Sequence, residues 1–227
     1  MQIKLQKLGL IAYKEAWDLQ EKLFSEILDA KISESKLVSE NKLLFCQHPH
    51  VYTLGKSGDK KNLLLNEEFL KAKEATFYQI NRGGDITYHG PGQIVGYPIL
   101  NLDSLDLSIK DYIFGLEEAI IRVLKTYGIT ATRSKGETGV WLDIENKQKT
   151  RKIAAIGVRI SRMVSMHGFA LNVNTNLEYY NYIIPCGITD KGVTSLQKEL
   201  GREIDINEVE TRLLEQFEEV LGIKILR

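Results

Sequence analysis

The sequence has little of what a secreted or membrane-bound chain relies on. Its 227 residues include only two cysteines, Cys46 and Cys186, which lie far apart in dissimilar surroundings. This count argues against a disulfide framework and favours a reducing compartment, in which a thiol stays free. No run approaches the roughly 18 apolar residues that span a bilayer, and the start of the chain lacks the pattern of a signal peptide. We therefore expect a cytoplasmic protein with no membrane partner.

An excess of charge of either sign is also missing. Thirty Lys and Arg residues balance thirty Asp and Glu residues, so the net charge indicates no nucleic-acid partner. The 43% hydrophobic and 26% charged residues are typical of a folded globular chain and exclude a disordered one. Because we find no internal repeat and no Pro- or Ser-rich linker, we expect a single domain over residues 1–227.

The hydrophobic pattern predicts strands that come in runs, with helices between some of them. Apolar residues at helical spacing predict helices from Ala12 to Ile27, over 108–127 with Gly128 ending it, and over 208–221, with a short helix over 66–73. The predicted strands are 1–10, 43–47, 51–55, 76–80, 93–102, a hairpin over 139–160, 165–174 and 223–226. This order favours an α+β fold, with a mixed β-sheet flanked by helices.

A glycine-dense segment, RGGDITYHGPGQ over 82–93, separates two predicted strands. Four glycines and a proline in twelve residues exceed what a turn needs, and they indicate a backbone passing where side chains would obstruct it. Free N–H groups in such a loop are suited to bind the oxyanion of an acyl transfer. A loose surface loop is the alternative, but Tyr88 and His89 are large residues and favour a functional lining.

The two cysteines differ in their sequence context. Cys46 lies in the apolar run LLFCQ and fits a small buried hydrophobic residue. Cys186 lies between Pro185 and Gly187, which indicates a defined bend rather than a regular element. A free thiol has a pKa of about 8.5, so a nucleophilic cysteine needs a neighbouring base or cation to become a thiolate.

Three residues are candidates to activate this thiol. Lys152 begins the apolar strand KIAAIGV, where a long amine can lie against the edge of the core. His89 and His167 are the other candidates, although a lone histidine in a strand is more often structural. From spacing alone, an exposed lysine at a strand end is the simpler interpretation of Lys152, and the residues leave these alternatives open.

Other site chemistries have weaker support. Cys46, His48 and His50 are close together, but there is no second ligand pair at zinc-finger spacing, so we expect no metal. The phosphate-binding loops GxxxxGK[ST] and GxGxxG are absent from the sequence.

Four segments resemble the successive motifs of the lipoyl(octanoyl) transferase family. They are RGGDITYHGPGQIVGYPILNL, RKIAAIGVRI, MHGFALNVN and IPCGITDKGVTSL. They occur in the family's order, and the resemblance covers nearly the whole chain. It implies a fold like the catalytic domain of the lipoate and biotin protein ligases. It also implies transfer of octanoyl from acyl carrier protein to the target lysine of a lipoyl domain, the first step of endogenous protein lipoylation.

The resemblance implies roles for individual residues. Cys186 would hold the octanoyl group as a thioester, and Lys152 would lower the pKa of the thiol and move the proton, with His167 as a possible supporting residue. The acyl and thioester groups would contact three stretches, which are Arg82, Gly83, Gly84, Asp85, Ile86, Thr87, Tyr88 and His89, then Ala155, Ile156 and Gly157, and then Gly168, Phe169 and Ala170.

The implied partners are acyl carrier protein, the lipoyl domains of 2-oxoacid dehydrogenase complexes and the glycine cleavage H protein. No cofactor is implied beyond the phosphopantetheine of the carrier. Because acyl carrier proteins are acidic, we expect Lys147, Lys149, Arg151 and Lys191 to attract the donor.

Alternatives remain open at this stage. An ATP-dependent lipoate or biotin ligase on the same fold forms an acyl-adenylate and needs no cysteine, so the Pro-Cys-Gly segment argues against it. An inactive acyl- or lipoyl-domain-binding module and a cysteine hydrolase are two further interpretations. The order His48-Pro49-His50 departs from the family's usual His-x-Pro, and His48 is therefore left out of the predicted site.

Overall fold

The computed structural model describes residues 2–33, 40–184 and 191–227. Its main element is a nine-stranded mixed sheet, in which β1 pairs with β2 in parallel and β2 pairs with β6 antiparallel. A short strand, β11 (Gly192–Val193), adds to β9. The other strands run in the order β12 (Lys224–Leu226), β1 (Gln2–Leu10), β2 (Lys42–Gln47), β6 (Gln93–Ile99), β10 (Val164–Asn172), β9 (Arg151–Ser161), β8 (Glu137–Leu142) and β7 (Thr132–Ser134).

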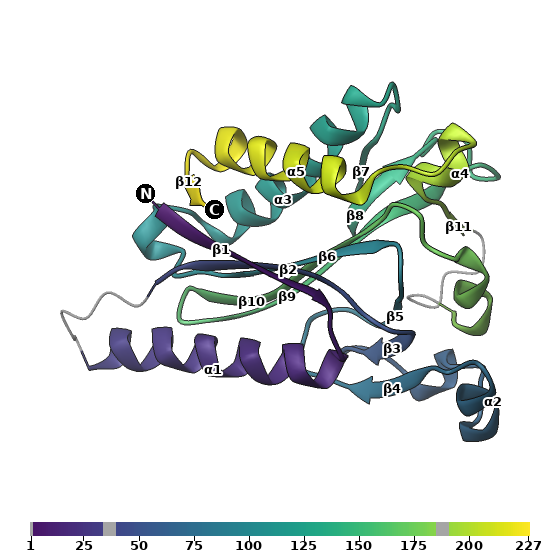
Figure 1. Ribbon diagram of the computed structural model, residues 1–227, viewed down its shortest axis with the longest axis horizontal. Coiled ribbons are helices and arrows are strands. Elements are labelled where there is room, and N and C mark those ends of the chain that lie inside the picture. Colours follow the sequence, from purple (N-terminus) through teal and green to yellow (C-terminus); the bar gives the residue numbers. More distant parts are fainter. Residues whose placement is uncertain (1, 34–39, 185–190) are drawn as a thin grey trace.

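Helices cover both faces of this sheet (Figure 1). Helix α1 (Tyr13–Ile32) lies along one face, and α3 (Ile109–Thr126) and α5 (Ile206–Leu221) lie along the other. Successive side chains of a strand point to opposite faces, so Leu43 and Phe45 pack with α3 and α5 while Leu44 and Cys46 pack with α1. The predicted α+β class, with a mixed sheet flanked by helices, is therefore confirmed.

The strongest predicted helix has the expected bounds. The Ser108 side chain caps the first turn of α3 by accepting a hydrogen bond from the backbone N–H of Asp111. Tyr112, Leu116, Ile120 and other apolar side chains of one face are buried against the sheet. Gly128 follows the last turn with a φ of +75°, a conformation that glycine adopts without strain.

A second, three-stranded sheet was not predicted. It contains β4 (Thr76–Gln79), β3 (Val51–Leu54) and β5 (Ile86–His89), with α2 (Glu67–Ala72) close to it in the chain. The expectation of one sheet was wrong because β3 pairs with β4 on one side and with β5 on the other, and β5 lies inside the segment predicted to be a loop. Two short helices, Leu177–Tyr182 and α4 (Leu196–Leu200), flank the Cys186 segment and were also not predicted.

None of the helices in the described residues is both long enough and apolar enough to cross a membrane.

Candidate active site

A cavity of about 390 Å³ lies where strands of the two sheets meet. Its walls include Thr87 and His89 of β5, Val95 and Tyr97 of β6, and residues of β9 and β10. The walls are largely apolar, since Ile113, Ile156, Val158, Phe169 and Ala170 all contribute to them. A concave apolar site with a few polar groups is the usual form of a small-ligand pocket.

The structure brings most of the predicted site residues to this one cavity. From the described residues, Lys152, His167 and all of the predicted binding residues except Ile86 and Tyr88 line it. These are Arg82, Gly83, Gly84, Asp85, Thr87, His89, Ala155, Ile156, Gly157, Gly168, Phe169 and Ala170. Three motifs that lie far apart in the sequence thus form the walls of a single site.

Ile86 and Tyr88 lie on the opposite face of β5. Because side chains alternate along a strand, Thr87 and His89 point to the cavity while Ile86 and Tyr88 pack in the core of the small sheet. The Tyr88 hydroxyl forms a 2.7 Å hydrogen bond with His50 Nδ1, and its ring stacks on Tyr179. Tyr88 therefore supports the small sheet and does not contact the cavity.

The glycines of the 82–85 segment allow it to lie closely on β9. The backbone N–H of Gly83 donates to Val158 O at 3.0 Å, so this group is used within the fold and is not a donor for an oxyanion. At Gly157 on β9, an added Cβ would lie 3.1 Å from Arg82 Cδ and from Gly83 O. Gly84 has a φ of +87°, in the left-handed region that favours glycine.

Arg82 places a buried positive charge in the wall. Its side chain donates from Nη2 to Thr53 O at 2.7 Å and from Nη1 to Gly83 O at 2.9 Å. This guanidinium lies close enough to His89 and His167 to disfavour a second positive charge on either ring.

Lys152 lies near the start of β9, half-buried, and lines the cavity. Its Nζ lies 4.4 Å from the centre of the Trp141 ring and 3.4 Å from Thr138 O. An ammonium over an indole face is a favourable cation–π contact. On its other side the strand pairs in parallel with β11, where Val193 is the partner of Lys152. The structure thus fixes the lysine from both neighbouring strands.

Cys186 lies outside the described residues, which flank it at Ile184 and Lys191. One flank is connected to the cavity wall through Asn62, and the other contacts the wall directly. The N–H of Ile184 donates to Asn62 O at 2.9 Å, and the Asn62 amide donates to the wall residue Asp85. Lys191 Nζ donates to the wall residue Glu137 at 2.6 Å. The chain therefore leaves and rejoins the described structure beside the site.

The two histidines in the wall are poor candidates for thiol activation. Burial, the nearby His48 ring and Arg82 lower the pKa of His89 to about 3. Burial, together with Arg82 and Arg159, lowers the pKa of His167 to about 3. Both rings are therefore neutral at pH 7 and neither supplies a positive charge to a thiolate.

His167 has an unusual backbone. Its φ of +59° lies in the left-handed region, within the otherwise regular strand β10. The N–H of His167 donates to Gln20 Oε1 at 3.1 Å, and its Nε2 donates to Asn81 Oδ1 at 2.8 Å. A non-glycine residue held in this region stores strain, and such residues cluster at functional sites.

Cys46 and His48 are used inside the core. Cys46 is 2% exposed, and burial raises the pKa of its thiol, which makes it a poor nucleophile. His48 forms hydrogen bonds with Ile11 O through Nδ1 at 2.8 Å and with the Tyr97 hydroxyl through Nε2 at 2.7 Å. Within residues 2–33, 40–184 and 191–227, no three metal-ligating side chains of His, Cys, Asp or Glu gather as a metal site would require.

Several wall residues were missed by the sequence analysis. Tyr13 and Tyr97 line the cavity, although their positions in an amphipathic helix and an apolar strand suggested core packing. Glu137 is the first residue of β8 and interacts with Lys191 and Lys152. Burial alone would raise the pKa of Glu137, but hydrogen bonds from Lys191 and Ser134 keep that pKa below its ordinary value.

The four basic residues expected to attract a donor fall into two pairs. Lys147 and Lys149 are exposed in the β8–β9 turn. Arg151 forms ion pairs with Glu199 and Asp143, and Lys191 forms one with Glu137. The charges of Arg151 and Lys191 are therefore balanced within the molecule.

Comparison with known proteins fits this geometry. The model of the lipoyl protein ligase A/B catalytic domain matches residues 12–218. The octanoyltransferase of Christiangramia forsetii is 57% identical over 99% of this chain and 97% of its own length. The octanoyltransferase of Bacteroides fragilis (strain YCH46) is 57% identical over 90% of this chain and 91% of its own length.

Solved structures at lower identity share the fold. The bi-partite lipoate protein ligase of Thermoplasma acidophilum has a TM-score of 0.71 at 16% identity, over 100% of this chain and 86% of that one. A biotin protein ligase from Aquifex aeolicus has a TM-score of 0.52 at 16% identity, over 98% and 70% of the two chains. With relatives more than half identical over nearly its full length, the chain belongs to the octanoyltransferases of the lipoyl protein ligase A/B catalytic domain family.

Proposed function

We propose that this protein moves an octanoyl group from acyl carrier protein to the target lysine of a lipoyl domain, through a thioester on Cys186. The observation that carries the proposal is the apolar cavity in which Lys152 and residues of three distant motifs meet. The octanoyltransferases that share 57% of its residues support the choice of acyl group and acceptor.

In the proposed first step, the Cys186 thiolate attacks the thioester carbonyl of the donor. A new S–C bond forms at Cys186 as the C–S bond to phosphopantetheine breaks, and the departing phosphopantetheine thiolate takes up a proton from Lys152, which is then neutral. Exchange of one thioester for another is nearly neutral in free energy, so this step needs no ATP. We accordingly propose that no cofactor takes part beyond the phosphopantetheine of the donor.

In the second step, the lysine amine of the lipoyl domain attacks the acyl-enzyme. An amide forms, the Cys186 thiolate leaves, and the amine loses its proton to Lys152. Lys152 is suited to this cycle because an amine can both hold and return a proton. Its place over Trp141 and beside the flanks of the Cys186 segment supports this role.

The apolar walls account for the octanoyl chain. Side chains such as Val95, Ile156 and Phe169 offer no hydrogen bond, and a saturated chain needs none. Burial contributes about 0.8 kcal/mol for each CH₂ group, or about 5 kcal/mol for six of them. The acyl chain itself thus supplies a large part of the binding free energy.

Intact mass spectrometry tests the proposal. Incubation with octanoyl-carrier protein and no ATP should add one octanoyl group, and later addition of apo lipoyl domain should remove it as octanoylated domain. Cys186→Ser should acquire no acyl group. Cys46→Ala is the matched control and should be acylated normally, because Cys46 is buried in the core.

Three results would contradict the proposal. An adduct on Cys46 would reject the nucleophile, a requirement for ATP would indicate an acyl-adenylate ligase, and release of free octanoate would indicate a hydrolase.

Charge in the β8–β9 turn should steer the acidic donor. Since Arg151 and Lys191 are paired internally, the steering falls to Lys147 and Lys149. We expect the KM for carrier protein to rise several-fold with added salt while kcat changes little. The double variant Lys147→Gln/Lys149→Gln should raise KM at low salt and flatten the salt dependence. A salt dependence unchanged in the double variant would show that the donor docks elsewhere.

A further inference from the structure

Gln93 lies next to the cavity and contacts one of its wall residues. It is fully buried in β6, and its side-chain oxygen forms a 2.8 Å hydrogen bond with His89 Nδ1. An amide oxygen accepts and does not donate, so in this bond the proton lies on Nδ1 of the imidazole. The orientation of the Gln93 amide therefore decides which nitrogen of His89 carries the proton.

A chain of buried amides fixes that orientation. The backbone carbonyl of Thr194 accepts a hydrogen bond, so Asn172 must present its Nδ2 to it, at 2.9 Å. The Oδ1 of Asn172 then faces Gln93 and accepts from Gln93 Nε2 at 2.8 Å. Gln93 Nε2 also lies 3.3 Å from Tyr88 O, a second acceptor. Reversing any one of these amides would place two donors or two acceptors against each other, which is costly in a buried site.

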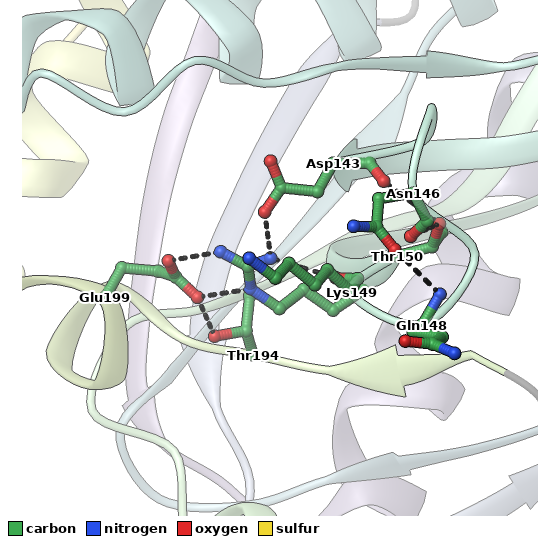
Figure 2. A network of polar contacts seen from close by, with 8 residues as sticks. Asp143, Asn146, Gln148, Lys149, Thr150, Thr194 and Glu199 are labelled. Atoms are coloured by element: carbon green, nitrogen blue, oxygen red, sulfur yellow. Dashed lines mark hydrogen bonds and ion pairs between the residues drawn. The ribbon is translucent and has the colours of Figure 1, made fainter.

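Thr194, at which this series of hydrogen-bonded amides ends, is itself held in place. Its N–H donates to Lys152 O at 2.9 Å, and its hydroxyl donates to Glu199 Oε1 at 2.5 Å. Glu199 also accepts two 2.7 Å hydrogen bonds from Arg151, the residue before Lys152 (Figure 2). A bidentate pair between Arg and a carboxylate is a strong, directional contact. The network anchors the amide chain to the strand that carries Lys152.

We propose that Gln93 is a positioning residue that locks His89 with its proton on Nδ1, so that Nε2 accepts a hydrogen bond from the attacking lysine amine. The proposal rests on the proposed function for the identity of the amine. A neutral ring with an acceptor nitrogen suits an N–H donor, whereas the opposite tautomer would turn an N–H toward that amine. His89 lines the cavity, and the lowered pKa of its ring keeps it neutral at the pH of the reaction.

Nitrogen-15 NMR of the histidine side chains in the full-length labelled protein tests the tautomer directly. The wild-type protein should show His89 with a protonated Nδ1 and an unprotonated Nε2 at pH 7. A protonated Nε2, or a charged ring, would overturn the proposal without reference to any activity.

Two variants of Gln93 then test the role in the reaction. Gln93→Leu removes the acceptor for Nδ1, and we expect both tautomers to appear and kcat to fall by roughly tenfold or more with little change in KM. Gln93→Glu keeps an oxygen acceptor and should keep the proton on Nδ1, but its second oxygen faces the acceptors Asn172 Oδ1 and Tyr88 O and should lower stability. Gln79→Leu, the same change at an exposed residue of β4, should behave as wild type.

The outcomes separate this inference from the proposed function. A Gln93→Leu variant with wild-type kcat would overturn the positioning role. A Gln93→Leu variant that keeps the single Nδ1–H tautomer would do the same, because the Gln93 amide would then not be what fixes the proton. A wild-type protein with the fixed tautomer but no octanoyl transfer would uphold the lock on His89 and reject the proposed function.

Discussion

Replacing Lys152 with methionine is expected to lower octanoyl transfer by roughly a thousandfold, within the range that proton transfer by a positioned side chain contributes. The same variant should move the pH midpoint of Cys186 alkylation up toward the value of about 8.5 of a free thiol. Methionine fills the space over Trp141. It carries no charge to lower the pKa of the thiol, and it has no proton to give or accept during transfer.

Lys152→Arg separates charge from proton transfer. A guanidinium keeps the positive charge, so the alkylation midpoint should stay near that of the wild type. Because a guanidinium stays protonated at accessible pH, it cannot accept the proton of the incoming amine, and transfer should still collapse.

The measurement is the rate of iodoacetamide reaction against pH, in a Cys46→Ala background, beside transfer assays. Robust transfer by the arginine variant would reject the proton role. A methionine variant with an unshifted midpoint would remove Lys152 as the thiol activator.

The second large effect concerns stability in mild acid. Burial is the main cause of three lowered histidine pKa values, about 4 for His48 and about 3 for both His89 and His167. In the unfolded chain each ring takes up a proton near pH 6.5, whereas in the folded protein it stays neutral. The unfolded state therefore binds more protons below pH 6.5, and the free energy of unfolding must fall as the pH is lowered.

The expected loss is steep. Each ring contributes about 1.4 kcal/mol per pH unit once the pH is below 6.5 and above its folded pKa. For three rings this amounts to about 6 kcal/mol between pH 7.5 and pH 5, which is comparable with the whole stability of a typical domain. Carboxylates with lowered pKa values, such as Glu118 and Glu199, act in the same direction but only at lower pH.

Urea unfolding at several pH values measures this loss. His48→Gln provides a control, because it should reduce the pH dependence by about a third whatever its effect on absolute stability. A free energy of unfolding that is constant from pH 7.5 to pH 5 would show that the three rings titrate in the folded protein as they do in the unfolded chain.

The sequence predicted the regular elements well where the hydrophobic pattern was strong. Helix α3 has a capping serine at its start, a buried apolar face and a glycine after its end, and its predicted bounds agree within one residue. The continuous apolar run of β2 likewise matches its two buried faces. In these elements local preference and tertiary packing favour the same structure.

The sequence could not show which strands pair. The segments at Val51 and Thr76 have ordinary strand patterns, but nothing local indicates that they form a separate sheet with β5. The four glycines of 82–93 concealed β5 because they suggested a loop throughout. Without the strand, the alternation that turns Ile86 and Tyr88 away from the cavity could not be foreseen.

The candidate site was predicted in its motif residues but not in its supporting ones. Tyr13 and Tyr97 reach the cavity from an amphipathic helix and an apolar strand, where their spacing indicates only burial. Arg151 and Lys191 appeared as exposed charges because their partners, Glu199 and Glu137, are distant in sequence. Long-range ion pairs leave no periodic signal, so only the structure reveals them.

The left-handed backbone of His167 has a consequence for how this chain can be improved. The strain costs about 1–3 kcal/mol, and glycine at this position would relieve it. Glycine would also remove the imidazole that contacts Asn81 and faces the cavity. Any stability gained by relieving this strain would therefore come at the expense of the site's shape. Position 167 marks a place where stability and function favour different residues.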